Sequence, residues 1–164
     1  MRAIVAGIPN VGKSTFINTL AGGAKAKAGN KPGVTRGNQW VKILPYLELM
    51  DTPGLLCPKL DNQIFAANLA YIGCIKDDIL DQEELVPNLL DKMHQLYPGA
   101  IEKRFGVNED QVGMDVLSDI SRKRGYILRG GEIDLERSYQ AILDEFRAGK
   151  IGRMTLDVFN QEGK

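Results

Sequence analysis

The sequence is poor in cysteine, histidine and long apolar stretches, and each shortage excludes a class of protein. Cys57 and Cys74 have no metal-ligand spacing with each other or with the single histidine, His94. This argues against a zinc site and predicts two free thiols in a reducing cytosol. No apolar run approaches the roughly 20 residues that cross a bilayer, so we expect no membrane span. We expect a cytoplasmic protein, with an organellar matrix as the alternative.

An excess of charge of one sign is also missing, although only on average. The 164 residues include 21 Lys and Arg and 21 Asp and Glu, which gives a net charge of zero. Residues 1–60 hold 8 basic and 2 acidic residues, whereas residues 61–164 hold 13 basic and 19 acidic ones. A basic first part suits phosphate groups and RNA, while the acidic remainder argues against general attraction to RNA.

What the sequence does contain is a phosphate-binding loop pattern. Gly7–Ser14 reads Gly-Ile-Pro-Asn-Val-Gly-Lys-Ser, which fits G-x-x-x-x-G-K-[ST]. The predicted context is a short buried strand at residues 3–6 and a helix at residues 15–20. The backbone N–H groups of such a loop and the positive end of the helix attract phosphate oxygens. In this pattern Lys13 reaches the β- and γ-phosphates, and the hydroxyl of Ser14 binds Mg²⁺.

A second motif, Asp51-Thr52-Pro53-Gly54, follows a predicted strand 38 residues after Lys13. Asp51 is placed to bind Mg²⁺ through a water, and Gly54 offers an unhindered backbone N–H to a γ-phosphate. Between the motifs, a basic loop of small residues leads to Thr35, whose hydroxyl completes Mg²⁺ coordination when a γ-phosphate draws the loop inward. Alone, Thr35 would be an ordinary residue at the start of a strand. The three elements together predict a nucleotide switch.

The remaining elements are predicted from apolar spacing. Two antiparallel strands, residues 38–44 and 46–50, are expected around Pro45. Helices are predicted at residues 62–72, 83–97, 100–105, 112–123 and 134–148, with a short strand or a frayed tail at 154–159.

Several motifs together closely resemble translation-factor-class GTPases and, among them, the ribosome biogenesis GTPase A (YlqF) family. The resemblance rests on the phosphate-binding loop, Pro32-Gly33-Val34-Thr35, Gln39-Trp40, Asp51-Thr52-Pro53-Gly54, residues 75–81, residues 130–134 and residues 149–153. It implies an α/β fold, with a partial, circularly permuted P-loop NTPase (GTPase) domain at residues 1–74. An all-α helical domain that contacts the ribosome or RNA would follow at residues 75–164.

The resemblance also implies an activity and a site. The activity would be GTP hydrolysis with Mg²⁺, coupled to late maturation of the large ribosomal subunit, whose rRNA and proteins would be the partners. The expected catalytic residues are Lys13, Thr35 and Gly54, and the expected Mg²⁺ ligands are Ser14, Thr35 and Asp51. The expected nucleotide-binding residues are Pro9, Asn10, Val11, Gly12, Lys13, Ser14, Thr15, Thr35 and Gly54.

Two departures from other GTPases stand out. No Asn/Thr-Lys-x-Asp motif is present to read guanine; residues 30–33 match its first two positions and end in Gly33. The resembled family places this motif before the phosphate-binding loop, so the chain looks like the carboxyl-terminal portion of such a protein, with the first strand's flank exposed. Where Ras-like enzymes have a water-orienting Gln, this chain has Leu55. We expect low intrinsic turnover, with the catalytic group supplied by a partner, another segment or a cation.

Three alternatives remain open from the residues. In related enzymes an Asn at the position of Asn10 helps to bind K⁺, but Asn10 is equally consistent with a role in shaping the loop. The chain is also consistent with a non-catalytic ribosome-binding fragment that binds phosphate weakly. A third alternative is a P-loop ATPase or small kinase, against which the Asp51-Thr52-Pro53-Gly54 motif together with Thr35 argues. The dense basic group at Arg122, Lys123, Arg124 and Arg129 is either an RNA contact or a complement to a helix carboxyl terminus. The basic loop with Lys25, Lys27, Lys31 and Arg36 is the second candidate for RNA contact.

Overall fold

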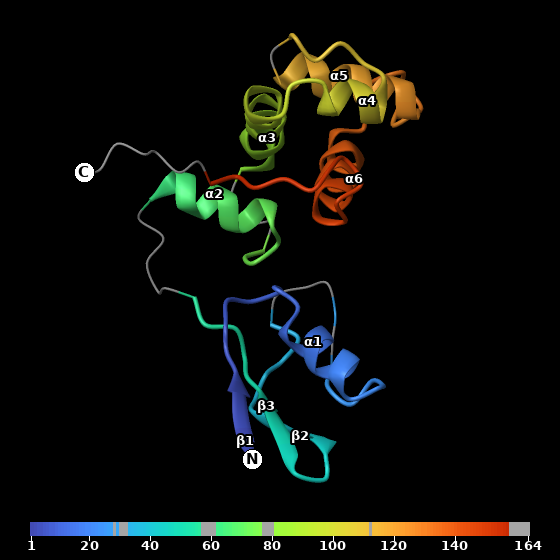
Figure 1. Cartoon of the computed structure of the whole chain (residues 1–164). Coiled ribbons are helices and arrows are strands. Elements are labelled where there is room, and N and C mark those ends of the chain that lie inside the picture. The colour runs from blue at the N-terminus through green and yellow to red at the C-terminus, as the bar shows by residue number, and fades with distance from the viewer. Residues whose placement is uncertain (28, 30–32, 57–61, 77–80, 112, 158–164) are drawn as a thin grey trace, which may run out of the picture. The chain divides into compact units, whose positions relative to one another are not determined.

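The computed structural model describes residues 1–27, 29, 33–56, 62–76, 81–111 and 113–157. The chain divides into two compact units, Met1–Ile79 and Leu80–Lys164. Figure 1 shows strands in the first unit and only helices in the second. This agrees with the predicted α/β fold followed by a helical part. The separate roles expected for residues 1–74 and 75–164 stay a prediction.

The first unit is built on a three-stranded sheet with the order β1-β3-β2. Strand β1 (Arg2–Val5) runs parallel to β3 (Leu47–Asp51), and β2 (Gln39–Leu44) runs antiparallel to β3. The expected antiparallel pair around Pro45 is therefore confirmed. Strand β1 lies at an edge of this sheet, and its first three residues are exposed.

Helix α1 (Lys13–Leu20) packs on the sheet and closes a small apolar core. The buried members of this core are Ile17, Ala26, Val41 and Leu49. The helix begins two residues earlier than expected, because the N–H of Phe16 already bonds to the carbonyl of Gly12 at 2.8 Å. Helix α2 (Gln63–Tyr71) follows, and Asn62 caps its first turn through its side-chain oxygen.

The second unit consists of α3 (Gln82–Leu96), α4 (Ala100–Phe105), α5 (Gly113–Arg124) and α6 (Leu135–Arg147). Helix α3 contacts each of the other three. Gly113 allows α5 to approach α3 closely, since a Cβ there would lie 2.2 Å from the carbonyl oxygen of Pro87. The four helices confirm the predicted ones to within two residues. Val112, where one was expected to begin, lies outside the described residues.

Two further local features belong to the second unit. A short strand or a frayed tail was expected at residues 154–159; the described residues 154–157 form no strand, and positions 158 and 159 lie outside the described residues. Ile127 and Ile133 form an antiparallel bridge that apolar spacing did not predict. Cys74 is buried and is not part of a disulfide, as expected; Cys57 lies outside the described residues. Among the helices of the described part of the chain, none is long and apolar enough to cross a membrane.

Candidate functional site

The loop between β1 and α1 leaves the amino end of α1 open. Gly12 at the cap position has φ 92°, in the left-handed region that favours glycine, and it provides no side chain to cap the helix. Asn10 also has a positive φ, of 58°, which Asn tolerates better than most residues. No side chain of the cap residue takes up the first N–H groups of α1, which are therefore placed to donate to an anion.

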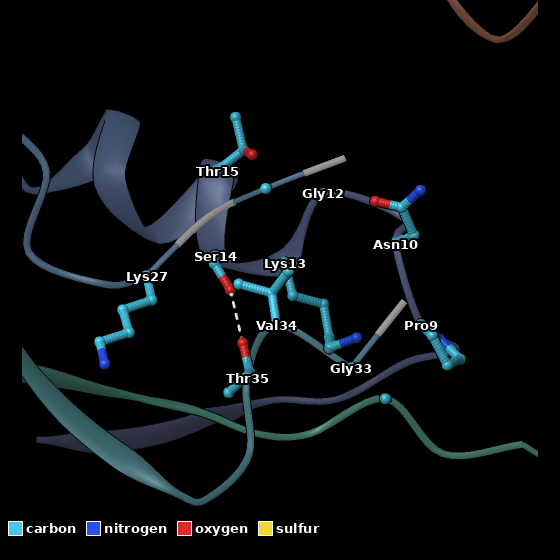
Figure 2. Close-up of a pocket in the computed structure, with 12 residues that line it drawn as sticks. Pro9, Asn10, Gly12, Lys13, Ser14, Thr15, Lys27, Gly33, Val34 and Thr35 are labelled. Carbon is cyan, nitrogen blue, oxygen red and sulfur yellow. Dashed lines mark hydrogen bonds between the residues drawn. The ribbon is translucent and has the colours of Figure 1, made fainter. Parts of the chain in front are cut away.

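A cavity of about 150 Å³ lies against this helix end. Figure 2 shows lining residues from the loop, from the first turn of α1 and from the segment that leads to β2. Gly54, the last residue of the motif after β3, also lines the cavity. The lining residues are Pro9, Asn10, Gly12, Lys13, Ser14, Thr15, Lys27, Gly29, Gly33, Val34, Thr35 and Gly54. Ligand pockets for whole small molecules usually measure about 300–1,000 Å³. This cavity by itself is the size of a chain of phosphate groups, and a second cavity of about 390 Å³ adjoins it at Lys27, Val34 and Thr35.

Three oxygen-bearing side chains meet at one edge of the cavity. The hydroxyl of Ser14 donates to Oδ2 of Asp51 at 2.6 Å and lies 3.1 Å from the hydroxyl of Thr35, a contact drawn in Figure 2. Thr35 also donates to Oδ2 of Asp51, at 3.2 Å. The three predicted Mg²⁺ ligands are thus brought together from α1, from the loop before β2 and from β3.

This cluster fits a divalent cation. Asp51 is only 1% exposed, and its Oδ1 atom has no hydrogen-bond partner in the described structure. A buried carboxylate oxygen without a partner is costly unless water or a cation satisfies it. Carboxylate and hydroxyl oxygens are ligands that Mg²⁺ accepts. The described residues contain no group of three or more His, Cys, Asp or Glu side chains suited to a metal, so a cation here would depend on the two hydroxyls.

The Asp51-Thr52-Pro53-Gly54 motif is fastened to the phosphate-binding loop. The Thr52 hydroxyl donates to the carbonyl of Val5 at 2.8 Å, and the N–H of Leu55 donates to the carbonyl of Gly7 at 3.1 Å. A Cβ at Gly54 would lie 2.4 Å from Cα of Pro9. Only glycine permits this close approach, so the two motifs meet with Gly54 in the cavity wall. Leu55 is 69% exposed.

The side-chain nitrogen atoms of Lys13 and Asn10 both donate to backbone carbonyl groups. The Lys13 amino group donates to the carbonyl of Ile8 at 2.7 Å, and it borders the cavity. The side-chain amide of Asn10 donates to the carbonyl of Gly73 at 3.2 Å. The remaining expected site residue, Val11, is not among the cavity-lining residues and is 52% exposed. The functional roles of all these residues stay predictions.

Four residues that line the cavity were not among the predicted site residues, namely Lys27, Gly29, Gly33 and Val34, and neither was Asn18, which supports the loop beside it. Asn18 lies in the middle of α1, where asparagine is unfavourable, and it forms three hydrogen bonds with the loop after the helix. An asparagine in the middle of a predicted helix is the sequence signal that could have identified this residue. Lys27 belongs to the basic loop that is the second candidate for RNA contact, which stays a prediction, and the structure places it in the lining of the phosphate cavity. No sequence pattern distinguishes it from Lys25.

Comparison with known proteins gives consistent matches. A family described as "50S ribosome-binding GTPase" matches residues 2–111. Ribosome biogenesis GTPase A of Bacillus cereus is 41% identical over 100% of this chain and 56% of its own length, and that of Thermotoga maritima is 29% identical over 95% and 56%.

Solved structures of YlqF give the same result. The GNP-bound protein from T. maritima has a TM-score of 0.62 and 26% identity, covering 92% of this chain and 56% of that one. A GDP-bound YlqF has a TM-score of 0.64 and 26% identity, covering 95% and 60%. The chain spans little more than half the length of the curated relatives that it matches.

Proposed function

Because this chain belongs to the family of 50S ribosome-binding GTPases, we propose that it binds and hydrolyses GTP as a ribosome assembly factor. The observation that carries the proposal is the meeting of Ser14, Thr35 and Asp51 beside an open helix end. Ribosome assembly would take place in the cytoplasm, with an organellar matrix as the alternative.

In the proposed site the phosphates would be held in two ways, directly by nitrogen donors and indirectly through Mg²⁺. Backbone N–H groups of the loop and of α1 would bind phosphate oxygens, and the Lys13 amino group would exchange its 2.7 Å bond with Ile8 for a phosphate. Ser14, Thr35 and Asp51 would hold Mg²⁺, which when bound neutralises phosphate charge. Thr35 would respond to the terminal phosphate, because it stands on the loop before β2 and not on α1.

Hydrolysis needs a group that this chain lacks at the expected place. Leu55 has no atom that orients water, and its side chain points into solvent at 69% exposure. We propose that turnover is slow and that K⁺, held with the help of Asn10, supplies part of the missing charge. Turnover at equal ionic strength in KCl and NaCl tests this. Equal rates in the two salts, or an unchanged K⁺ effect in Asn10→Ala, would exclude the cation.

The first test of the proposed function is Lys13→Ala. Lys13 contributes charge to phosphates but little packing, so we expect triphosphate binding to fall at least about a hundredfold, which is about 2.7 kcal/mol, with the fold intact. Isothermal titration of the 164-residue chain with a non-hydrolysable GTP analogue measures this loss. Binding that stays within about threefold of wild type, under 1 kcal/mol, would show that this loop does not bind phosphate.

A second test concerns the base. No carboxylate in an Asn/Thr-Lys-x-Asp motif is present to read guanine. We therefore expect the chain to prefer GTP over ATP by much less than about a hundredfold. Competition titrations measure the ratio. A hundredfold preference would place a guanine-reading group among these residues.

We propose that the partner is the large ribosomal subunit, in late maturation, and that the second unit contacts its RNA. Arg122, Lys123 and Arg124 end α5, and all three are exposed. Replacing them and Arg129 together by Gln should weaken sedimentation with large subunits and reduce its salt dependence, since each phosphate contact releases counterions. If affinity and salt slope both stay unchanged with triphosphate bound, the basic group only complements the helix end.

The same sedimentation assay separates the alternative function. A non-catalytic ribosome-binding fragment is favoured by one observation, the exposed Leu55 in place of a water-orienting side chain. Such a fragment would bind subunits equally with and without nucleotide, and added subunits would leave its GTP turnover at background.

A further inference from the structure

A second lysine borders the phosphate cavity. Lys27 lines it together with Ser14 and Thr35, and it also lines the adjoining cavity that contains Asp51. Figure 2 shows Lys27 on the other side of the Ser14–Thr35 pair from the tip of the phosphate-binding loop. Its side chain is exposed, and in the part of the chain that the structure describes nothing pairs with its amino group. The amino group is therefore available to a ligand.

The backbone just before Lys27 is anchored to α1 and to β2. The amide of Asn18 donates to the carbonyl of Ala26 at 2.8 Å. The oxygen of the same amide accepts the N–H groups of Lys25, at 2.9 Å, and of Ala26, at 2.7 Å. From the other side, the Gln39 amide donates to the carbonyl of Lys25 at 3.3 Å. Four hydrogen bonds thus fix where the chain enters the cavity wall.

Packing adds to this anchor. Ala26 is 5% exposed and belongs to the core formed by α1 and the sheet. Beyond Lys27 in the chain, a Cβ at Gly29 would come within 3.1 Å of a methyl group of Val34, and both residues line the same cavity as Lys27. Lys27 is therefore held at the cavity by groups on both sides of it.

The charge of a bound nucleoside triphosphate favours a second lysine at this cavity. Its lining contains two lysines, Lys13 and Lys27, and no carboxylate. A nucleoside triphosphate carries more negative charge than one lysine and one divalent cation neutralise. A lysine is a compact point charge on a flexible stem, so it can reach phosphate oxygens without a fixed geometry.

We propose that Lys27 is a second phosphate-binding cation, which pairs with non-bridging oxygens on the side of the Ser14–Thr35 pair away from the loop. This rests on the proposed nucleotide binding. Because its anchor runs through Asn18 and Gln39 and not through Thr35, Lys27 stays in place whether or not a terminal phosphate is bound. It therefore acts on diphosphates and triphosphates alike.

The test is isothermal titration of the whole chain with GDP, with a non-hydrolysable GTP analogue and with inorganic tripolyphosphate. We expect Lys27→Gln to weaken binding of all three about tenfold, or about 1.4 kcal/mol. The loss should shrink at high salt, because screening weakens an exposed charge. Lys27→Arg, which keeps the charge, should restore most of the affinity.

Lys42→Gln is the matched control, since Lys42 is an exposed lysine of the same unit on β2 and lines neither cavity. It should bind all three ligands within about twofold of wild type, under 0.5 kcal/mol. Affinities of Lys27→Gln equal to those of the control would overturn the inference, as would a loss confined to the triphosphates or absent for tripolyphosphate. If Lys13→Ala abolishes binding while Lys27→Gln does not weaken it, only this inference fails. If wild type binds none of the ligands, the proposed function fails with it.

Discussion

The two units of the chain differ in how many of their large apolar side chains are exposed. Among the residues that the structure describes, fifteen large apolar side chains are exposed, of which twelve belong to the first unit and three to the second. The fully buried large side chains of the second unit come from four helices, whereas those of the first unit are Ile17 and Asp51. Helical packing therefore accounts for the second unit. The first unit depends more on directed hydrogen bonds around a polar cavity and, on our proposal, gains stability from the ligand that fills it.

The largest effect is expected for Leu89→Ala in α3, which tests whether the two units fold separately. Leu89 is fully buried, so its truncation leaves a cavity, and we expect the second unit to lose about 2–5 kcal/mol of unfolding free energy. If the units are energetically separate, triphosphate binding by the first unit should persist. Differential scanning calorimetry with and without ligand measures both effects. Ile17→Ala, at an equally buried site in α1, is the matched control and should do the reverse. Loss of binding in Leu89→Ala would show that the units fold as one.

Glu109 is an exception to this difference, because it is a buried carboxylate in the second unit, which is otherwise stabilised by packing of apolar side chains. It is 4% exposed and accepts the N–H groups of Gly99 and of Glu102, the latter at 2.9 Å, with His94 Nδ1 at 3.2 Å. These bonds satisfy the start of α4. We expect Glu109→Gln to cost about 1.5–3 kcal/mol, the usual value for hydrogen bonds to a charged group.

The pH dependence of the second unit follows from the same carboxylate. Burial works to raise the pKa of Glu109, but hydrogen bonds from the backbone and from His94 outweigh it and lower the pKa below the usual 4.5. A lowered pKa stabilises the fold above the unfolded-state value and loses that contribution as pH falls through the folded-state value. The free energy of unfolding of wild type should therefore fall as the pH drops below about 4.5. Glu109→Gln should have a lower free energy of unfolding at neutral pH, and this free energy should depend less on pH in the acid range than that of wild type. If the two proteins lose stability equally as the pH falls, another group causes the acid sensitivity.

Asn18→Ala tests the first unit's dependence on directed bonds. The change removes three hydrogen bonds, each worth about 1 kcal/mol when partly buried, so we expect a loss of about 1–3 kcal/mol. Hydrogen exchange measured by mass spectrometry should show faster exchange in residues 24–27 with α3 unaffected. Thr19→Ala is the control, because its hydroxyl donates only to the carbonyl one turn earlier in α1, at 2.9 Å. Unchanged exchange in Asn18→Ala would mean that the loop is held by packing alone.

The smallest effect is expected at the sheet edge. Arg2 pairs with Glu48 at 2.8 Å, and its guanidinium lies 5.1 Å from the ring of Trp40. The Arg2 side chain is 70% exposed, and such pairs contribute less than about 1 kcal/mol. Arg2→Ala should therefore shift the calorimetric midpoint of the first unit only slightly, and the shift should vanish in high salt. A loss comparable with that of Asn18→Ala would contradict this ranking.

Sequence patterns predicted the parts of the site that depend on neighbours in the chain. The loop before Lys13 and the motif after β3 were located because glycine, lysine and hydroxyl groups recur there at fixed spacing. The close approach of Gly54 to Pro9 was not foreseeable, because it follows from the parallel pairing of β1 with β3. Glu109 and Asn18 were missed for a related reason. Their partners are backbone groups that tertiary packing brings within reach, and no spacing rule marks a backbone donor.

The single tryptophan of the chain, Trp40, lies on β2 in the first unit and is 45% exposed. Its intrinsic fluorescence therefore reports on the first unit alone, and its wavelength should shift to the red as the sheet opens. Far-ultraviolet circular dichroism is weighted toward the second unit, which contains four of the six helices of the described residues. One unlabelled sample observed at both wavelengths would yield a separate melting curve for each half of the molecule.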